Sequence, residues 1–259
     1  MATNTINENV EQAILDFGTI KQAIIDKGVE VPDGTPTSQY ATKIGEIQSG
    51  GSSSDDLKGM IERTATEITV PSDCTKIGNC AFSECKNLTS VSMPDIIISI
   101  GTSAFDSCEN LALASLPSGI TSISNNAFSL CTNLALTSLP SGVTSIGQGS
   151  FGGCSKLALT SLPEGLTSIG DSAFFDCTNL AITSIPSGIT RIGYGVFGNC
   201  TGLTEITFEG TPNYISSDAF VGCTNITTIR VPWNEGDVAG APWGASSASI
   251  VYAYTPETT

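Results

Sequence analysis

A period of 23 residues recurs from about position 67 to 231, and it constrains the fold more than any other feature of the chain. Phenylalanine follows this period at Phe82, Phe105, Phe128, Phe151, Phe174, Phe197 and Phe220. Cysteine follows it at Cys85, Cys108, Cys131, Cys154, Cys177, Cys200 and Cys223, and isoleucine at Ile77, Ile100, Ile123, Ile146, Ile169, Ile192 and Ile215. A short period with apolar positions locked to it predicts a solenoid, in which equivalent residues stack into one core.

A single 23-residue unit is not expected to fold by itself. A buried Phe or Leu gives about 1.5–3 kcal/mol, whereas ordering the backbone costs about 1–2 kcal/mol per residue. Only stacked units therefore bury enough apolar surface, and seven of them are present.

Local patterns within a unit predict its elements. "TSLP" indicates a short strand ended by a proline that cannot extend a ladder, and "SGVTSIG" a turn followed by a short extended segment. "DSAFFDC" places an N-cap type of residue before a single helical turn. We therefore predict an α/β repeat solenoid over residues 57–231: a leucine-rich-repeat-like stack of seven 23-residue units with short parallel strands.

A G-x-G-x-x-G string occurs at Gly147, Gly149 and Gly152 and again from Gly193. A dinucleotide-binding loop needs a strand–turn–helix unit of about thirty residues, which this repeat cannot contain. Phe151, inside the string, belongs to a core column. We interpret these glycines as repeat positions and expect no cofactor.

The repeat pattern P-x-G-[IVL]-T-x-I-G-x-x-[AS]-F-x-x-C-x-x-L resembles the BspA-like leucine-rich repeats of bacterial and phage surface proteins. The resemblance covers about two thirds of the chain, with seven copies in register. It implies an adhesin or another binding scaffold that is not an enzyme, and it carries no catalytic residue.

Nine cysteines could suggest disulfides, but seven of them form one repeat column. Their side chains point the same way and their number is odd, so we expect buried free thiols. Cys74 replaces a core residue, whereas Cys80 replaces a polar one and is expected to be exposed. No paired C-x-x-C suggests a metal site.

The repeat changes in its four middle units. Positions occupied by Ser90, Glu205 and Thr228 in the outer units become apolar in these units, at Leu113, Leu136, Leu159 and Ile182. Because side chains alternate across a strand, these four residues could form an exposed, partner-binding stripe. The alternative, which we favour, is a local strand shift that buries them and exposes Thr137 and its equivalents.

The N-terminal part of the chain lacks the repeat. Its apolar residues are spaced by three and four positions, as in a helical coil: Ile6, Val10, Ala13, Phe17, Ile20 and Ile24. Gly18 also permits two shorter helices. We predict a small helical attachment and oligomerisation module over residues 1–48 and a Gly/Ser linker over 49–56.

Residues 232–259 are predicted to cap the open end of the solenoid with Trp233 and Trp243. Residues 20–47 and 231–245 resemble segments of bacteriophage tail and baseplate-appended proteins.

The charge of the chain limits the classes of function that it could have. The chain has 10 Lys and Arg residues against 25 Asp and Glu, a net charge of −15, and no histidine. This charge disfavours nucleic-acid binding, and the lack of histidine removes serine–histidine catalysis. We expect no metal, no membrane insertion and no signal peptide.

The leading hypothesis is a non-enzymatic phage virion protein, a tail fibre or baseplate-tip component made in the host cytoplasm. Its N-terminal module would bind other tail or baseplate proteins and form a homo-oligomer, with a trimer favoured. Its solenoid would bind a host-surface protein or glycan. The alternatives are a BspA-like bacterial surface adhesin and a structural spacer that carries another receptor-binding protein.

Overall fold

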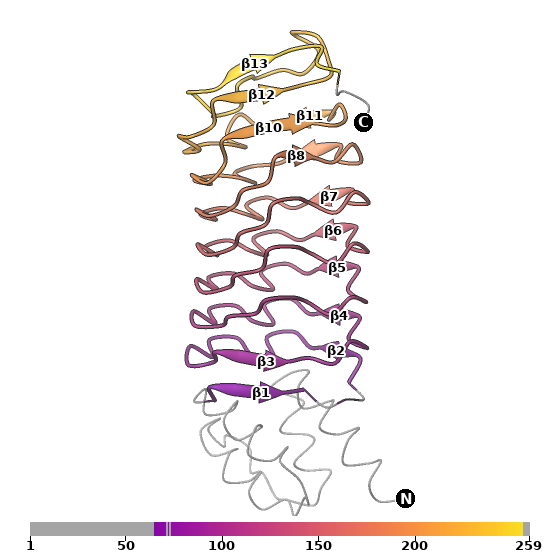
Figure 1. The fold of residues 1–259 in the computed structure, drawn as a ribbon, viewed down its shortest axis with the longest axis vertical. Helices are drawn as coiled ribbons and strands as arrows, with labels where there is room; N and C mark the ends of the chain where they lie inside the picture. Colours follow the sequence, from indigo (N-terminus) through magenta and orange to yellow (C-terminus); the bar gives the residue numbers. More distant parts are fainter. Residues whose placement is uncertain (1–64, 71, 73, 256–259) are drawn as a thin grey trace, which may run out of the picture.

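The computed structural model describes residues 65–70, 72 and 74–255, which form a stack of parallel coils (Figure 1). Each coil contributes a short strand to one or both of two faces. The predicted N-terminal helical module and the linker lie outside the described residues.

The first face carries the strand that contains the repeated isoleucine. Strands β2 (Lys76–Ile77), β4 (Ser99–Ile100), β5 (Ser122–Ile123), β6 (Ser145–Ile146) and β7 (Ser168–Ile169) form one parallel sheet. Strands β9 (Arg191–Ile192) and β11 (Tyr214–Ile215) pair beyond it. Ile77 pairs with Ile100, and Ile123 with Ile146, so the repeat period sets the register directly.

The second face carries strands of two to four residues, and only toward the ends of the stack. Strand β1 (Glu67–Thr69) pairs with β3 (Ser90–Ser92). Strands β8 (Ser184–Ile185), β10 (Glu205–Phe208), β12 (Thr228–Arg230) and β13 (Ser249–Val251) form a second parallel sheet. No strand is assigned on this face between β3 and β8, a stretch that the structure describes throughout.

The interior is a set of ladders, as the period predicts. The seven repeat phenylalanines are buried, and their rings stack with neighbouring centroids 5.0–5.6 Å apart. The stacked, nearly parallel rings repeat at close to the spacing of adjacent strands, about 4.8 Å. The predicted single interior line of phenylalanines is confirmed.

The predicted α/β character is wrong, since no helix occurs in the described residues. The segment around each phenylalanine consists of consecutive tight turns. Its backbone N–H groups bond alternately to the next coil and to the same segment. The N–H of Phe82 donates to the carbonyl of Ala104 in the next coil at 2.7 Å, whereas the N–H of Cys85 donates to the carbonyl of Phe82 at 3.1 Å. A helix would keep these donors within the segment; here every second one joins two coils.

The C-terminal segment adds one further coil. The indole rings of Trp233 and Trp243 are buried, with centroids 5.3 and 6.0 Å from the ring of Phe208. The N–H of Phe220 donates to the carbonyl of Trp243 at 2.9 Å. These contacts cover the last phenylalanine of the ladder.

Candidate functional site

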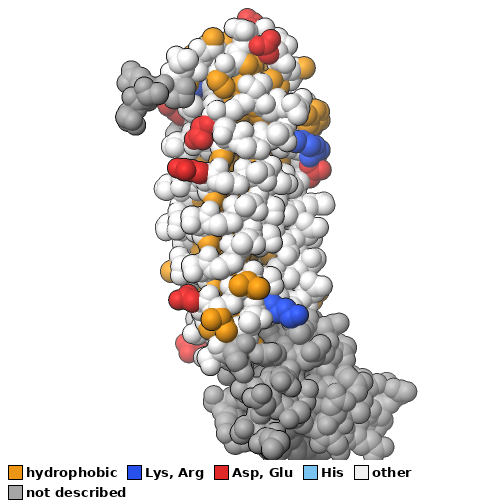
Figure 2. Space-filling view, turned by 90° about the vertical axis from the view of Figure 1, so that its right-hand side faces the viewer, with side chains coloured by type: hydrophobic (Ala, Val, Ile, Leu, Met, Phe, Trp, Pro, Cys, Tyr) orange, Lys and Arg blue, Asp and Glu red, His pale blue; other side chains and the backbone are white. Residues whose placement is uncertain are grey.

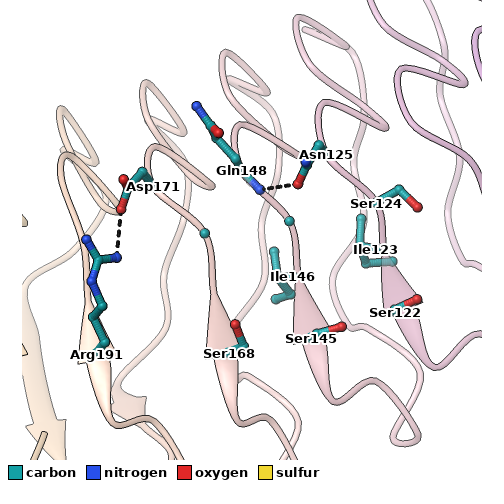
Figure 3. A pocket seen from close by; sticks show the side chains of 12 residues that line it. Ser122, Ile123, Ser124, Asn125, Ser145, Ile146, Gln148, Ser168, Asp171 and Arg191 are labelled. Carbon is teal, nitrogen blue, oxygen red and sulfur yellow. Dashed lines mark hydrogen bonds and ion pairs between the residues drawn. The ribbon is translucent and has the colours of Figure 1, made fainter.

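A polar groove lies on the first face (Figure 3), and its volume is about 460 Å³. One wall is a ladder of strand residues: Ser122, Ser145, Ser168 and Arg191. The other wall, one turn later in each coil, is formed by Asn125, Gln148 and Asp171. The floor between them contains Gly147 and Gly170, so two side-chain ladders face each other across a column of small residues.

Gly147 and Gly170 lie in this column because neighbouring coils approach closely here. A Cβ on Gly147 would lie 2.6 Å from both the backbone nitrogen and Oδ1 of Asn125. That Oδ1 accepts a hydrogen bond from the backbone N–H of Gln148 at 2.9 Å. The same bond joins Asn79 to Thr102 at 2.8 Å. The side-chain oxygen thus bridges coils across the position of the absent Cβ.

These contacts account for the first two glycines of the G-x-G-x-x-G string at 147–152. Gly147 permits the close approach, and Gly149 has a φ of +58°, a left-handed conformation that favours glycine. No strand–turn–helix unit surrounds either glycine, both of which lie in the described coils. The interpretation as repeat positions is confirmed.

An ion pair crosses the groove near its C-terminal end. Arg191 Nη1 donates to Asp171 Oδ1 at 2.9 Å, and the pair lies over Gly193, where a Cβ would collide with both groups. Oδ1 of Asp171 also accepts the backbone N–H of Tyr194 at 3.2 Å. On its other side, the Arg191 guanidinium carbon lies 5.4 Å from the ring centroid of Tyr214.

The face that carries the groove is mostly uncharged (Figure 2). Its surface consists largely of backbone and of side chains that are neither hydrophobic nor charged, with few acidic and basic side chains. Several hydroxyls bond the preceding coil, as Thr167 Oγ1 does to the carbonyl of Thr144 at 3.1 Å. Within the described part of the chain, no side-chain hydrogen bond occupies the hydroxyls of Ser122, Ser145 and Ser168, so they are available to a ligand.

The cysteine column is structural. Each buried thiol from Cys108 onward donates to the carbonyl of a phenylalanine in the preceding coil, as Cys154 Sγ does to Phe128 at 3.0 Å. Burial raises the pKa of Cys108, Cys131 and Cys177 well above that of an exposed thiol. None of the nine cysteines, all of which lie in the described coils, forms a disulfide, and only Cys80 is exposed, as the sequence predicted.

No group of three or more metal-ligating side chains occurs in the described part of the chain. No helix long and apolar enough to cross a membrane occurs there either.

The proposed apolar stripe is not a surface. Leu113 is 6% exposed, Leu136 and Leu159 0% and Ile182 1%. Thr137 and Thr160 are exposed instead. The assignment of the four apolar residues to partner binding is therefore corrected, and the favoured alternative, the strand shift, describes these coils.

The shift has a simple cause. In the outer coil, Leu88 and Val91 point inward three residues apart, and no bend separates Leu88 from strand β3. In the middle coils, Leu134 and Leu136 point inward two residues apart, and the bend follows at Thr137 and Ser138. In three of these coils the chain bends at Ala114, Thr137 or Thr160, and no strand follows on the second face. The coil of Ile182 has no such bend and carries β8.

The predicted oligomerisation residues lie outside the described part of the chain: Ile6, Val10, Ala13, Phe17, Ile20 and Ile24. The groove, in contrast, was missed by sequence reasoning. Its signal is present in the repeat, since a Ser before the core isoleucine and a small residue after it recur in "TSIG".

Comparison with solved structures identifies similar coil stacks. The leucine-rich repeat protein TpLRR of T. pallidum is 32% identical with a TM-score of 0.55, covering 62% of this chain and 78% of that one. A leucine-rich repeat protein from Bacteroides ovatus is 23% identical with a TM-score of 0.39, covering 73% and 61%. A leucine-rich cell surface protein from Faecalibacterium prausnitzii is 21% identical with a TM-score of 0.39, covering 74% and 80%. A search of curated proteins finds no match.

The family model described as "BspA type Leucine rich repeat region" matches residues 62–158 and 135–238, in six copies. These residues include the phenylalanine, cysteine and isoleucine ladders. The chain therefore belongs to the BspA-type leucine-rich repeat family.

Proposed function

We propose that this chain is a non-enzymatic binding protein whose solenoid presents the polar groove to a partner on a cell surface. The observation that carries the proposal is the groove itself: hydroxyl, amide and ionic groups are held in register on stacked, rigid coils. The family supports a scaffold role by analogy. Multivalent display would allow weak contacts per solenoid to add up through effective concentration.

Binding of the labelled full chain to a panel of intact bacterial and animal cells tests this function. Ser145→Arg places a long cation inside the groove and should abolish binding to cells that the parent chain binds. Thr160→Arg, on the exposed second face, serves as the matched control and should bind normally. Equal binding by both variants, or no binding by the parent, contradicts the proposal.

Two biological settings fit this function. A bacterial surface adhesin agrees with the family. A phage tail fibre or baseplate-tip protein agrees with the resemblance of residues 20–47 and 231–245 to phage proteins. Neighbouring genes for tail components would favour the virion, and neighbouring genes for surface-anchored proteins would favour the adhesin.

In either setting we propose that the N-terminal residues drive self-association, with a trimer favoured. Replacing both Ile6 and Val10 by Asp in the full chain should convert the oligomer to a monomer in sedimentation experiments. An Asn4→Asp, Asn7→Asp variant adds the same charge off the apolar seam and should leave the oligomer intact. A parent chain that sediments as a monomer contradicts this proposal.

A further inference from the structure

We infer that the C-terminal end of the groove is a subsite for a neutral glycan, built around Tyr194, Tyr214 and the Asp171–Arg191 ion pair. This inference names the ligand class of the proposed binding function and rests on it. The evidence is the chemistry of the groove walls, the exposure of two aromatic rings and the charge of the chain.

The two tyrosines continue the two walls of the groove. Tyr214 follows Ser168 and Arg191 in the serine ladder, and Tyr194 follows Gln148 and Asp171 in the amide ladder. Both rings are displayed: Tyr194 is 59% exposed and Tyr214 50%. All seven phenylalanines of the repeat ladder are buried, so these rings stand apart from the core.

The coil stack does not require aromatic rings at these positions. Earlier coils hold Asn125 or Ser122 at the equivalent positions and stack in the same way. Tyrosine combines an apolar ring face with a polar tip. Such a side chain matches a sugar ring, whose C–H face is apolar and whose edge carries hydroxyls.

Polar groups next to the rings are positioned by the fold. Asp171 is fixed by Arg191 and by the N–H of Tyr194, and Arg191 lies against the ring of Tyr214. Because these contacts are internal, the carboxylate and guanidinium lose little freedom when a ligand binds. Their remaining acceptors and donors, with the amide of Gln148, suit the paired hydroxyls of a sugar.

Charge and polarity distinguish a neutral glycan from other ligands. The net charge of −15 opposes an anionic polysaccharide. A protein partner would favour an apolar interface centre, whereas the groove walls are hydroxyl and amide groups. The volume of about 460 Å³ lies within the range of small-ligand sites.

Affinity electrophoresis of the full chain in gels containing single polysaccharides tests the inference. The probes are mannan, galactan, soluble starch and glycol chitin as neutral polymers, and hyaluronan and heparin as anionic ones. We expect at least one neutral polymer and neither anionic polymer to retard the chain. Tyr194→Ala and Tyr214→Ala should each weaken that affinity by about tenfold or more.

Matched variants separate stacking from folding. Tyr194→Phe keeps the ring and should retain most of the affinity. Leu130→Ala removes another exposed apolar side chain, one that does not line the groove, and should leave the affinity unchanged. Retardation by anionic polymers alone, by no polymer, or equally for the parent and both tyrosine-to-alanine variants overturns the inference.

Treating target cells with periodate, which cleaves sugar diols, distinguishes the glycan inference from the broader function. Cell binding that is lost after periodate and blocked by the retarding polymer supports the glycan. Cell binding that survives periodate overturns the glycan but leaves the binding function standing. A parent chain that binds no cell removes the function itself.

Discussion

At the scale of the residue, Gly147 shows how a missing Cβ sets the distance between coils. The backbone and side chain of Asn125 occupy the space that a Cβ would need. The inter-coil hydrogen bond from Gln148 depends on this approach. At Gly147 itself, packing against Asn125 leaves no space for a Cβ, although the backbone dihedrals are ordinary and Ser124 occupies the equivalent position of the preceding coil.

Gly147→Ala should lower the free energy of unfolding by about 1–3 kcal/mol, the usual cost of overpacking. Gly165→Ala is the matched control, because no atom lies within 4 Å of the point that its Cβ would occupy and its φ is not positive. It should stabilise the chain by about 0.4–1 kcal/mol through the entropy of the unfolded state. Urea unfolding midpoints measure both, and equal shifts would contradict this account.

Ser150 is a polar exception within an apolar column. Its hydroxyl is buried and has no hydrogen-bond partner among the described residues, whereas the equivalent positions hold Ala127 and Ala173. Ser150→Ala should raise the free energy of unfolding by about 1 kcal/mol, since an unpaired buried hydroxyl costs about 1–3 kcal/mol.

Ser124→Ala serves as the control for Ser150→Ala, because it should change the free energy of unfolding in the opposite direction. Its Oγ donates to the carbonyl of Ile100 at 2.6 Å, so its loss should destabilise the chain by about 0.5–1.5 kcal/mol. Thermal or urea unfolding of the two variants gives the comparison. A destabilising Ser150→Ala would show that its hydroxyl is satisfied.

At the scale of the element, the position of one bend decides whether the second face carries a strand. In the outer coil no bend interrupts the chain at Val91, and β3 forms there and pairs with β1. Leu136 turns inward earlier, and the outward pair Thr137 and Ser138 replaces the strand. The same length of chain thus forms a strand in the outer coils and in the coil of Ile182, and a bend in the coils of Leu113, Leu136 and Leu159.

Leu136→Ala should cost about 2–5 kcal/mol of unfolding free energy, as expected for a fully buried leucine. Thr137→Ala, at the adjacent exposed position, should change it by no more than about 0.5 kcal/mol. Denaturant titrations followed by circular dichroism test the pair. A neutral Leu136→Ala would restore the exposed-stripe hypothesis.

At the scale of the whole molecule, the column of buried thiols makes the free energy of unfolding depend on pH in the alkaline range. Burial raises the pKa of five thiols in the folded chain: Cys108, Cys131, Cys154, Cys177 and Cys200. In the unfolded chain these thiols ionise near their ordinary pKa of about 8.5. Their contribution is therefore complete below that pH and is lost as the pH rises toward the raised folded pKa.

The five thiols together should lower the free energy of unfolding by about 3 kcal/mol between about pH 8 and about pH 9. Urea unfolding under reducing conditions at the two pH values measures the change. Cys131→Ala should remove about one fifth of this pH dependence. Stability that is constant over this range would show that the thiols ionise equally well in the folded chain.

The groove is also a property of the whole molecule, because no single coil contains it. Its walls come from Ser145 and Gln148 and their equivalents in successive coils. "TSIG" revealed the serine and the small residue in each unit, but not that the next turn would face them. That arrangement depends on the tight turns, which the sequence suggested would be helical.

The 23-residue period by itself determined the solenoid, the phenylalanine line and the buried thiols, because identical spacing forces like residues to stack. Only the tertiary structure decided the turn conformation, the burial of Leu113, Leu136, Leu159 and Ile182, and the groove. The turns are set by N–H groups that pair with the neighbouring coil, and such partners are not visible in one repeat. Which side chains of a coil are buried depends on where the chain bends, since a shift of one residue exchanges the inner and outer faces of a strand.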